Sequence, residues 1–292
     1  MTLDQLRVFV AVAEHGHVTR AAKDLSITQS AASAAIGALE ARYNVTLFDR
    51  VGRGIALTEA GQRFLPEAKA VLGRASAAQM ALEDLSGLTI GRLRIAASQT
   101  IASYWLPSRL AAYRRRHPGI ALDVTIGNTA QVEQWVFEGA ADLGIVEGAP
   151  RQRDLSSVVV GHDRMAMVAA PNDPLAVALG GTDPLSTRWV VREAGSGTRA
   201  VFDSWVAAHG LTQDQVEIAL VLPSNEAVRE AVEAGAGATI ISAHVVAASL
   251  RGGALVAINF DCPPRDFLLL QHPARHVSRA QAAFVEILPL FA

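Results

Sequence analysis

Residues 28–40 read TQSAASAAIGALE, and this stretch decides how the N-terminal part of the chain folds. On a helix, its polar side chains fall on one side and its apolar side chains on another. The two groups are Gln29, Ser30 and Ser33, and Ala32, Ile36 and Leu39. Thr28 precedes them and carries a hydroxyl suited to an N-cap. The stretch therefore predicts a helix that begins after Thr28, buries one side and exposes a short polar side.

Two shorter helices are predicted before this one. Over residues 3–13 apolar residues recur at spacings of three and four, and Gly16 is suited to end the helix. These apolar residues are Leu3, Leu6, Val10 and Ala13. A second helix is expected to begin with Thr19 as its N-cap. Small side chains at Ala21, Ala22, Ala31 and Ala32 let two helices cross closely, as a helix-turn-helix requires.

The residues after the third helix distinguish a DNA-binding unit from an ordinary three-helix bundle. Residues 47–50 and 51–58 predict a short pair of strands with a glycine-rich tip. Arg50 and Arg53 lie at this tip, where they are suited to contact phosphates or the minor groove. The polar first turns of the third helix can then enter the major groove. The pattern indicates a winged helix-turn-helix over residues 1–58.

Five motifs in order resemble the LysR family of transcriptional regulators. They are Leu6–Phe9, Thr19–Ala22, Thr28–Glu40, Leu47–Arg50 and Leu57–Gly61. The resemblance implies contact with double-stranded promoter DNA through seven residues: Thr28, Gln29, Ser30, Ser33, Ala34, Arg50 and Arg53. Ala34 and Ala35 depart from the basic or amide residues of many members. We expect an apolar contact there, such as one with a thymine methyl, or base reading by Gln29, Ser30 and Ser33 alone.

Residues 59–88 predict a long linker helix with a narrow apolar seam. Spacings of four and three connect Leu65, Ala68, Leu72, Ala75, Gln79, Leu82 and Leu85. Such a seam pairs helices in coiled coils, although it also fits a helix packed on its own domain. We favour dimerisation through this helix, because two helix-turn-helix units are needed to read a palindrome. The resemblance implies the same homodimer, and a tetramer as the family assembly. Pro66 is expected to bend the helix near its start.

Composition excludes several classes of protein. Half of the 292 residues are hydrophobic and 18% are charged, which indicates a chain folded throughout. No apolar run reaches the roughly 20 residues that span a bilayer, and no export signal opens the sequence, so we expect a cytoplasmic protein without a membrane partner. The single cysteine, Cys262, excludes an internal disulfide and a cysteine-cluster metal site. The net charge of −2 argues against indiscriminate coating of nucleic acid.

Residues 89–292 alternate strand-like and helix-like runs, which predicts an α/β domain. The strand-like runs are Leu93–Ala97, Leu122–Ile126, Leu143–Val146, Ser157–Val160, Met165–Ala169, Trp189–Arg192, Ile218–Leu222, Thr239–Ile241, Leu255–Ile258 and Phe267–Leu270. The helix-like runs are Ser103–Arg116, Ala130–Glu138, Arg199–His209 and Ala227–Ala234. Open sheets of this kind bind ligands at the carboxyl ends of their strands.

Polar residues and glycines collect at these strand ends. The candidate effector-binding residues are Ser98, Gln99, Thr100, Asn128, Thr129, Glu147, Gly195, Ser196, Gly197, Thr198, Arg199, Ser224 and Asn225. Hydroxyls and backbone N–H groups at helix N-termini favour an anion, and Arg199 adds a bidentate fork. Each of these hydroxyls taken singly also fits an ordinary helix N-cap. Their number in one domain favours a site for a small anionic metabolite or oxyanion, with no resident cofactor or metal.

The resemblance sharpens the architecture of this second domain. It implies two α/β lobes of the periplasmic-binding-protein type, joined by crossovers near Val159–His162 and Phe260–Phe267, with the effector between them. Lobe I would comprise residues 91–160 and 268–292, and lobe II residues 161–267. Residues 101–107 and 195–199 are most similar to the subgroup that regulates carbon fixation and sulfur assimilation. That similarity favours an oxyanion or a phosphorylated metabolite.

These residues bear on three classes of function. The first is a LysR-type regulator whose DNA binding is controlled by an effector between the lobes. The second is a solute-binding-type sensor without sequence-specific DNA binding, which residues 1–58 argue against. The third is an enzyme, which the scattered histidines and carboxylates do not support, since they show no metal-ligand spacing or recognisable triad.

Overall fold

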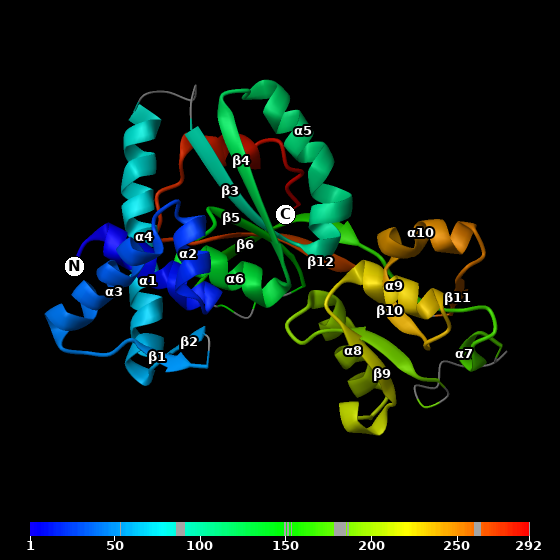
Figure 1. Ribbon diagram of the computed structural model, residues 1–292. Helices are drawn as coiled ribbons and strands as arrows, with labels where there is room; N and C mark the ends of the chain where they lie inside the picture. The colour runs from blue at the N-terminus through cyan, green and yellow to red at the C-terminus, as the bar shows by residue number, and fades with distance from the viewer. Residues whose placement is uncertain are drawn as a thin grey trace. The chain divides into compact units, whose positions relative to one another are not determined.

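A computed structural model describes residues 1–52, 54–85, 91–148, 150, 152, 154–177, 185, 187–259 and 264–291. Arg53, Cys262 and the first half of the expected second crossover lie outside these residues. The chain forms two compact units (Figure 1): Met1–Leu85 with Glu138–Ala140, and Ser86–Phe137 with Ala141–Ala292. The long linker helix belongs to the first unit. Each unit is described by itself.

The first unit is a winged helix-turn-helix followed by one long helix. Its elements are α1 (Leu3–His15), α2 (Val18–Asp24), α3 (Gln29–Tyr43), β1 (Phe48–Val51), β2 (Gly54–Leu57) and α4 (Glu59–Leu85). The antiparallel pair β1 and β2 forms the wing, in which Val51 faces Gly54 at the tip. Ser26, with a φ of 55°, makes the tight turn between α2 and α3.

Capping side chains set the ends of these helices. Thr28 accepts a hydrogen bond from the backbone N–H of Ala31, and Gly16 ends α1 in the left-handed conformation, both as predicted. The N-cap predicted for α2 was wrong. His17 holds that position, because its Nδ1 accepts from the backbone N–H of Thr19. An imidazole nitrogen thus replaces the usual hydroxyl.

The buried side of α1 also differs from the predicted one. Leu6, Phe9 and Val12 are buried, whereas Leu3 is 41% exposed. Phe9 packs against the rings of Phe48 and Phe64, so the wing and α4 select which side of α1 turns inward.

The seam of α4 is covered along its first half by its own unit. Leu65, Ala68 and Leu72 pack on the cluster that contains Leu6 and Phe9. For these three residues the alternative interpretation of the seam, a helix packed on its own domain, therefore holds. Val71 is 42% and Leu82 is 70% exposed, so the uncovered apolar surface of α4 lies around these two residues.

The second unit contains two lobes, each with a core of its own. The elements of lobe I are β3 (Gly91–Ser98), η1 (Ile101–Trp105), α5 (Leu106–Arg116), β4 (Ile120–Gly127), α6 (Thr129–Glu138), β5 (Leu143–Glu147), β6 (Ser156–Asp163), β12 (Arg265–Gln271) and α11 (Arg279–Val285). Its five-stranded sheet has the order β4-β3-β5-β12-β6. Strands β3, β4 and β5 are parallel, and β12 runs antiparallel to both of its neighbours.

The alternation of side chains along β3 builds two cores. Leu93, Ile95 and Ala97 pack with α5 and α11 on one face of the sheet, and Ala96 packs with α6 on the other. Because successive side chains of a strand point to opposite faces, Ile95, Ala96 and Ala97 supply apolar side chains to both faces of the sheet. The carboxyl ends of these parallel strands therefore hold the polar residues that follow them.

Lobe II also has helices on both faces of its strands. Its elements are β7 (Met165–Ala169), α7 (Pro174–Val177), β8 (Trp189–Arg192), α8 (Gly197–Ala208), η2 (Gln213–Gln215), β9 (Ile218–Leu222), α9 (Asn225–Glu233), β10 (Thr239–Ser242), α10 (Ala243–Arg251) and β11 (Val256–Ile258). The strands form sheets of order β10-β7-β11 and β8-β9, linked by a bridge between Trp189 and Ala238. Helices α7 and α8 cover one face, and α9 and α10 cover the other.

Strands β6 and β12 connect the two lobes. They pair with each other in antiparallel register from Ser156 opposite Gln271 to Asp163 opposite Arg265, with an irregularity near Phe267. Within the described residues, no helix is both long enough and apolar enough to cross a membrane.

Candidate functional site

Helix α3 presents a continuous exposed polar surface. Thr28, Gln29, Ser30, Ser33 and Ala34 are all exposed. Gln29 Nε2 donates to Ser33 Oγ at 2.9 Å, and the hydroxyls of Thr28 and Ser30 lie 3.0 Å apart. These amide and hydroxyl groups are free to exchange their internal bonds for contacts with base edges.

The opposite side of α3 explains why this surface faces outward. Ala32, Ile36 and Leu39 are buried, and Ala21 and Ala22 of α2 are at most 2% exposed. Small side chains at this crossing let α3 pack closely on α2. Arg50 on the wing is exposed, which leaves its guanidinium available to phosphate.

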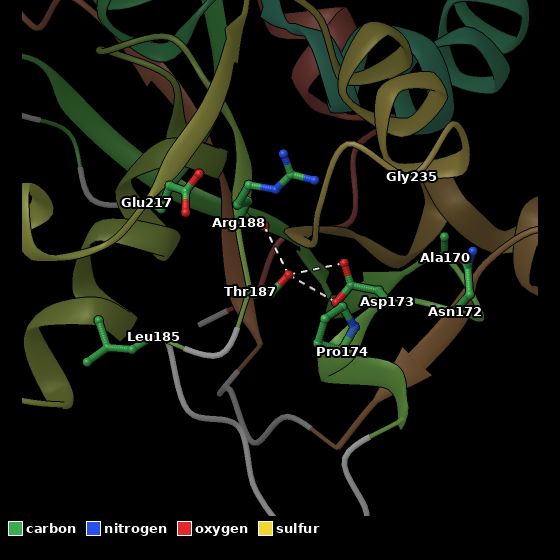
Figure 2. A pocket seen from close by; sticks show the side chains of 9 residues that line it. All are labelled: Ala170, Asn172, Asp173, Pro174, Leu185, Thr187, Arg188, Glu217 and Gly235. Carbon is green, nitrogen blue, oxygen red and sulfur yellow. Dashed lines mark hydrogen bonds between the residues drawn. The ribbon is translucent and has the colours of Figure 1, made fainter.

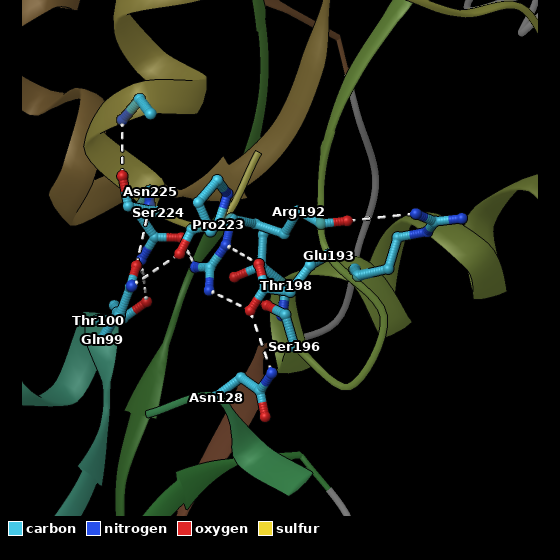
Figure 3. A network of polar contacts seen from close by, with 12 residues as sticks. Gln99, Thr100, Asn128, Arg192, Glu193, Ser196, Thr198, Pro223, Ser224 and Asn225 are labelled. Carbon is cyan, nitrogen blue, oxygen red and sulfur yellow. Dashed lines mark hydrogen bonds and ion pairs between the residues drawn. The ribbon is translucent and has the colours of Figure 1, made fainter. Parts of the chain in front are cut away.

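In the second unit, most of the candidate effector residues meet where the two lobes touch (Figure 3). We call this region the lobe boundary. It comprises the ends of β3 and β4 in lobe I, and the N-termini of α8 and α9 in lobe II. Ser196 caps α8 and Ser224 caps α9, so the ordinary N-cap explanation holds for these two hydroxyls. Asn128 Oδ1 likewise accepts from the backbone N–H of Gln131 in α6.

Three hydrogen bonds at Gln99 and Thr100 join the lobes directly. Gln99 Nε2 donates to the carbonyl oxygen of Pro223, and Gln99 Oε1 accepts from the backbone N–H of Asn225, both at 3.0 Å. Asn225 Nδ2 donates to Thr100 Oγ1 at 3.0 Å. Because Thr100 and Asn225 are each 1% exposed, this contact is shielded from water.

A second contact joins the lobes beside α6. The backbone N–H of Ala130 donates to the carbonyl oxygen of Gly195 at 3.2 Å. Gly195 has a φ of +89°, which a side chain rarely allows. A Cβ on Gly197 would lie 2.9 Å from the carbonyl oxygen of Glu147 and 3.0 Å from Thr129 Oγ1. Glycine at these two positions lets the backbones of the lobes approach closely.

Arg192 is the last residue of β8 and is a buried cation beside the loop that contains Gly195. It was not among the site residues predicted from the sequence. Its side chain is 3% exposed. Arg192 Nε and Nη2 donate to the two carboxylate oxygens of Glu193 at 2.7 and 2.9 Å, and Nη1 donates to Asn225 Oδ1. Asn128 Nδ2, from lobe I, donates to Glu193 Oε1 at 3.2 Å. Burial raises the pKa of Glu193, but the hydrogen bonds and charge of Arg192 outweigh it, so that pKa lies below its usual value.

Arg199 was expected to supply the charge for an effector, and its contacts differ from that expectation. Its Nε donates to Asp203 Oδ1 at 2.7 Å, its Nη2 to Gln213 Oε1 at 2.8 Å and its Nη1 to the carbonyl oxygen of Arg192. The pairing with Asp203 is an i, i+4 ion pair along α8. All three nitrogens of Arg199 therefore bind groups of lobe II.

A second buried ion pair lies at the start of β12. Arg265 Nε and Nη2 donate to Asp163 Oδ2 at 2.9 and 2.7 Å, and Glu147 Oε1 lies 3.8 Å from Nη2. Ser242 Oγ donates to the other oxygen of Asp163 at 2.8 Å. Sequence reasoning missed Arg265 and Asp163, because the first residue of one strand and the last of another become neighbours only through strand pairing.

Two hydroxyls at the lobe boundary are buried without a partner. Ser98 Oγ and Thr129 Oγ1 make no hydrogen bond with the described residues, although Ser98 is 2% and Thr129 is 9% exposed. A buried hydroxyl without a partner is costly, so these two groups are suited to a ligand.

Lobe II also contains a pocket of about 400 Å³ that lies outside the lobe boundary (Figure 2). It is lined by Ala170, Asn172, Asp173, Pro174, Leu185, Thr187, Arg188, Glu217 and Gly235. Asp173 already accepts from the hydroxyl of Thr187 at 3.0 and 3.1 Å and from the backbone N–H of Leu175. No group of His, Cys, Asp and Glu among the described residues is arranged to hold a metal ion.

Two family models match the chain. The model for "Bacterial regulatory helix-turn-helix protein, lysR family" matches residues 3–62, and that for "LysR substrate binding domain" matches residues 86–289. The chain is a LysR-type transcriptional regulator. The alternative of a solute-binding sensor without sequence-specific DNA binding has no support from these matches.

Curated relatives of this LysR-type regulator are also named as regulators. "Uncharacterized HTH-type transcriptional regulator YeiE" of Escherichia coli (strain K12) is 34% identical over 98% of this chain and 96% of its own length. "RuBisCO operon transcriptional regulator" of Allochromatium vinosum is 31% identical over 98% of this chain and 95% of its own. The second of these relatives agrees with the carbon-fixation subgroup indicated by the sequence.

Solved structures share the fold of this LysR-type regulator. Full-length CbnR complexed with its target DNA superposes with a TM-score of 0.66 over 99% of both chains, at 23% identity. The regulatory domain of CcmR from Synechocystis PCC6803, in complex with 2-PG, is 26% identical over 67% of this chain and 94% of its own, with a TM-score of 0.59. The first likeness concerns the fold alone.

Proposed function

We propose that this regulator reads a palindromic promoter site through α3 and the wing, and that a small anion held at the lobe boundary controls its activity. The observation that carries the DNA-binding part is the exposed surface of Thr28, Gln29, Ser30, Ser33 and Ala34. A polar helix side of this kind fits the major groove, which displays a distinct pattern of donors and acceptors at each base pair. Arg50, and Arg53 by its place in the sequence, would hold the wing on the phosphates.

Operator binding tests this part. Gln29→Ala should weaken binding to a promoter fragment by about 1–3 kcal/mol, since one base contact is lost. Arg50→Ala should weaken binding to all sequences and lower the salt dependence of log K by about one. Both are measured by fluorescence anisotropy at several salt concentrations, with Arg116→Ala as the control. If neither variant changes operator affinity, α3 does not read DNA in this way.

Homo-oligomerisation is part of the same proposal. Two recognition helices must be paired to read both halves of a palindrome. Val71 and Leu82 leave part of α4 apolar and uncovered within one subunit, which favours α4 as the dimer contact. These two residues are exposed, whereas Leu65, Ala68 and Leu72 are covered by the subunit itself. Membership of the family adds the expectation that four subunits assemble into a tetramer.

The effector part of the proposal rests on the two hydroxyls that lack partners among the residues that the structure describes. Ser98 Oγ and Thr129 Oγ1 are buried at the lobe boundary, and the N-termini of α8 and α9 lie on its other side. Donor groups at helix ends favour an anion. The CcmR regulatory domain was solved in complex with 2-PG, which supports a small metabolite as the ligand class. The protein would act by binding the effector and promoter DNA, without catalysing a reaction. It would do so in the cytoplasm, where the DNA is.

Ser98→Ala tests the effector assignment. The variant should unfold at the same or a slightly higher temperature, because it removes a buried hydroxyl without a partner. It should also lose most of the thermal shift that an active small anion produces in the wild type, with sulfate, inorganic phosphate and 2-PG as the first probes. Arg199→Ala, which acts within lobe II, should retain that shift. An unchanged shift in Ser98→Ala would remove this hydroxyl from the site.

A further inference from the structure

The carboxylate of Glu193 is bound by both lobes at once. Arg192 of lobe II donates two hydrogen bonds to it, and Asn128 of lobe I donates a third. Figure 3 shows the carboxylate between the Arg192 guanidinium and the Asn128 amide. A planar pair of oxygens on an arginine fork is the arrangement by which proteins bind carboxylates, sulfates and phosphates. The chain thus places an anion of its own at the lobe boundary.

The two partners of this ion pair differ in exposure. The side chain of Arg192 is 3% exposed, whereas that of Glu193 is 27% exposed. A buried guanidinium that loses its partner is left as an uncompensated charge away from water, which is strongly unfavourable. A part-exposed carboxylate can instead rotate towards the solvent. The buried guanidinium of Arg192 therefore needs an anion bound to it, whereas the carboxylate of Glu193 can be solvated by water without Arg192.

The ion pair at the start of β12 provides a comparison. Asp163, the partner of Arg265, has a fully buried side chain and is also held by Ser242. Asp163 therefore has no route to water, and that pair is fixed. Arg199 is paired with Asp203 along its own helix. Of these three arginines, Arg192 is the most buried, and it is the one whose carboxylate partner is both part-exposed and bound by the two lobes.

We propose that Glu193 occupies the position of the effector's anionic group, and that an external carboxylate, sulfate or phosphate binds Arg192 and Asn128 by displacing it. This inference rests on the proposed function, because it assigns the anion to the lobe boundary. It makes Glu193 the residue that sets effector affinity. In the free protein Glu193 holds the lobes together through Asn128, and in the bound protein the ligand takes over that bond.

Isothermal titration of the full-length protein with sodium sulfate and with inorganic phosphate, at constant ionic strength, tests the displacement. Glu193→Gln should bind these anions at least about tenfold more tightly than the wild type, because its neutral amide competes less for Arg192. Asp203→Asn is the matched control. It removes the same kind of charge from the other arginine of this region and should leave the affinity unchanged. Adding Arg192→Gln to Glu193→Gln should abolish the gain.

The outcomes are distinguishable. Equal affinity in Glu193→Gln and the wild type, including no binding by either, overturns the displacement, as does a gain that survives Arg192→Gln. Circular dichroism and thermal melting establish that each variant folds, and Glu193→Ala replaces Glu193→Gln if the amide disturbs packing. Operator binding is measured separately. Intact operator binding with unchanged anion affinity in Glu193→Gln refutes only this inference, whereas loss of operator binding in the wild type refutes the proposed function.

Discussion

Asn225 donates a hydrogen bond from its Nδ2 to Thr100 Oγ1 at 3.0 Å, which joins the two lobes across 125 positions of sequence. Both residues are almost fully buried. The same Asn225 side chain accepts from Arg192 Nη1, and its backbone N–H donates to Gln99 Oε1. One asparagine therefore connects the end of β3 with the buried arginine of lobe II.

Asn225→Ala should destabilise the second unit by about 1–3 kcal/mol, because Thr100 Oγ1 and one arginine nitrogen lose a partner where water has little access. The free energy of unfolding in urea measures this effect. Asn172→Ala, on an exposed asparagine of lobe II, is the control and should change that free energy by less than about 0.5 kcal/mol. Equal effects of the two substitutions would show that the contact with Thr100 does not stabilise the fold.

Gly197→Ala should separate the lobes beside α6 without unfolding either of them. The added Cβ would lie 2.9 Å from the carbonyl oxygen of Glu147, which is backbone and has little freedom to move. Hydrogen–deuterium exchange at the amide of Ala130, which donates to Gly195, should become faster. At Gly252 an added Cβ meets no heavy atom closer than 3.4 Å, so Gly252→Ala should leave that exchange unchanged. Continued protection in Gly197→Ala would contradict the close approach.

Tyr113 should make the second unit sensitive to alkali. Burial raises the pKa of Tyr113 to about 12, and its hydroxyl donates to the carbonyl oxygen of Ala280. Because the folded state raises this pKa above the unfolded value of about 10, the stabilisation is complete below pH 10 and is lost as pH rises towards 12. Two pKa units correspond to roughly 2–3 kcal/mol.

Urea unfolding between pH 8 and pH 12 measures this dependence. Tyr113→Phe should be less stable at pH 8 by about 1 kcal/mol, the contribution of one hydrogen bond, and should lose less stability towards pH 12 than the wild type. Tyr43→Phe, on a tyrosine that is 53% exposed, should follow the wild type. Parallel curves for Tyr113→Phe and the wild type would contradict the raised pKa.

Local pattern was sufficient to predict most of the elements. Each strand-like run named from the sequence overlaps an observed strand, from Leu93–Ala97 in β3 to Phe267–Leu270 in β12. The predicted N-cap of α3 and the glycine end of α1 were also confirmed. These features depend on side-chain period and on bonds within a few residues. The error at Thr19 was local, because His17 two residues earlier caps the helix. The errors at Leu3 and the α4 seam arose where residues distant in sequence decide which side is buried.

The candidate sites, like the elements, include parts that follow from local sequence and parts that depend on distant residues. The exposed side of α3 follows from one helical period, so Gln29, Ser30 and Ser33 could be selected from sequence alone. Arg192 and Arg199 flank the same glycine loop, and the local pattern does not decide which of the two is the more buried. The i, i+4 partner Asp203 was a local signal for the structural role of Arg199. No local signal pairs Arg265 with Asp163, which are 102 positions apart.

The sequence by itself determined the family, the winged helix-turn-helix and the alternating strands and helices, because motif spacing and side-chain period act within short segments. The tertiary structure alone decided which arginine is buried at the lobe boundary, which hydroxyls lack partners and which side of α4 is free. The physical reason is that charge pairing and burial depend on which strands and helices become neighbours, and only the folded chain brings residues such as Thr100 and Asn225 within hydrogen-bonding distance.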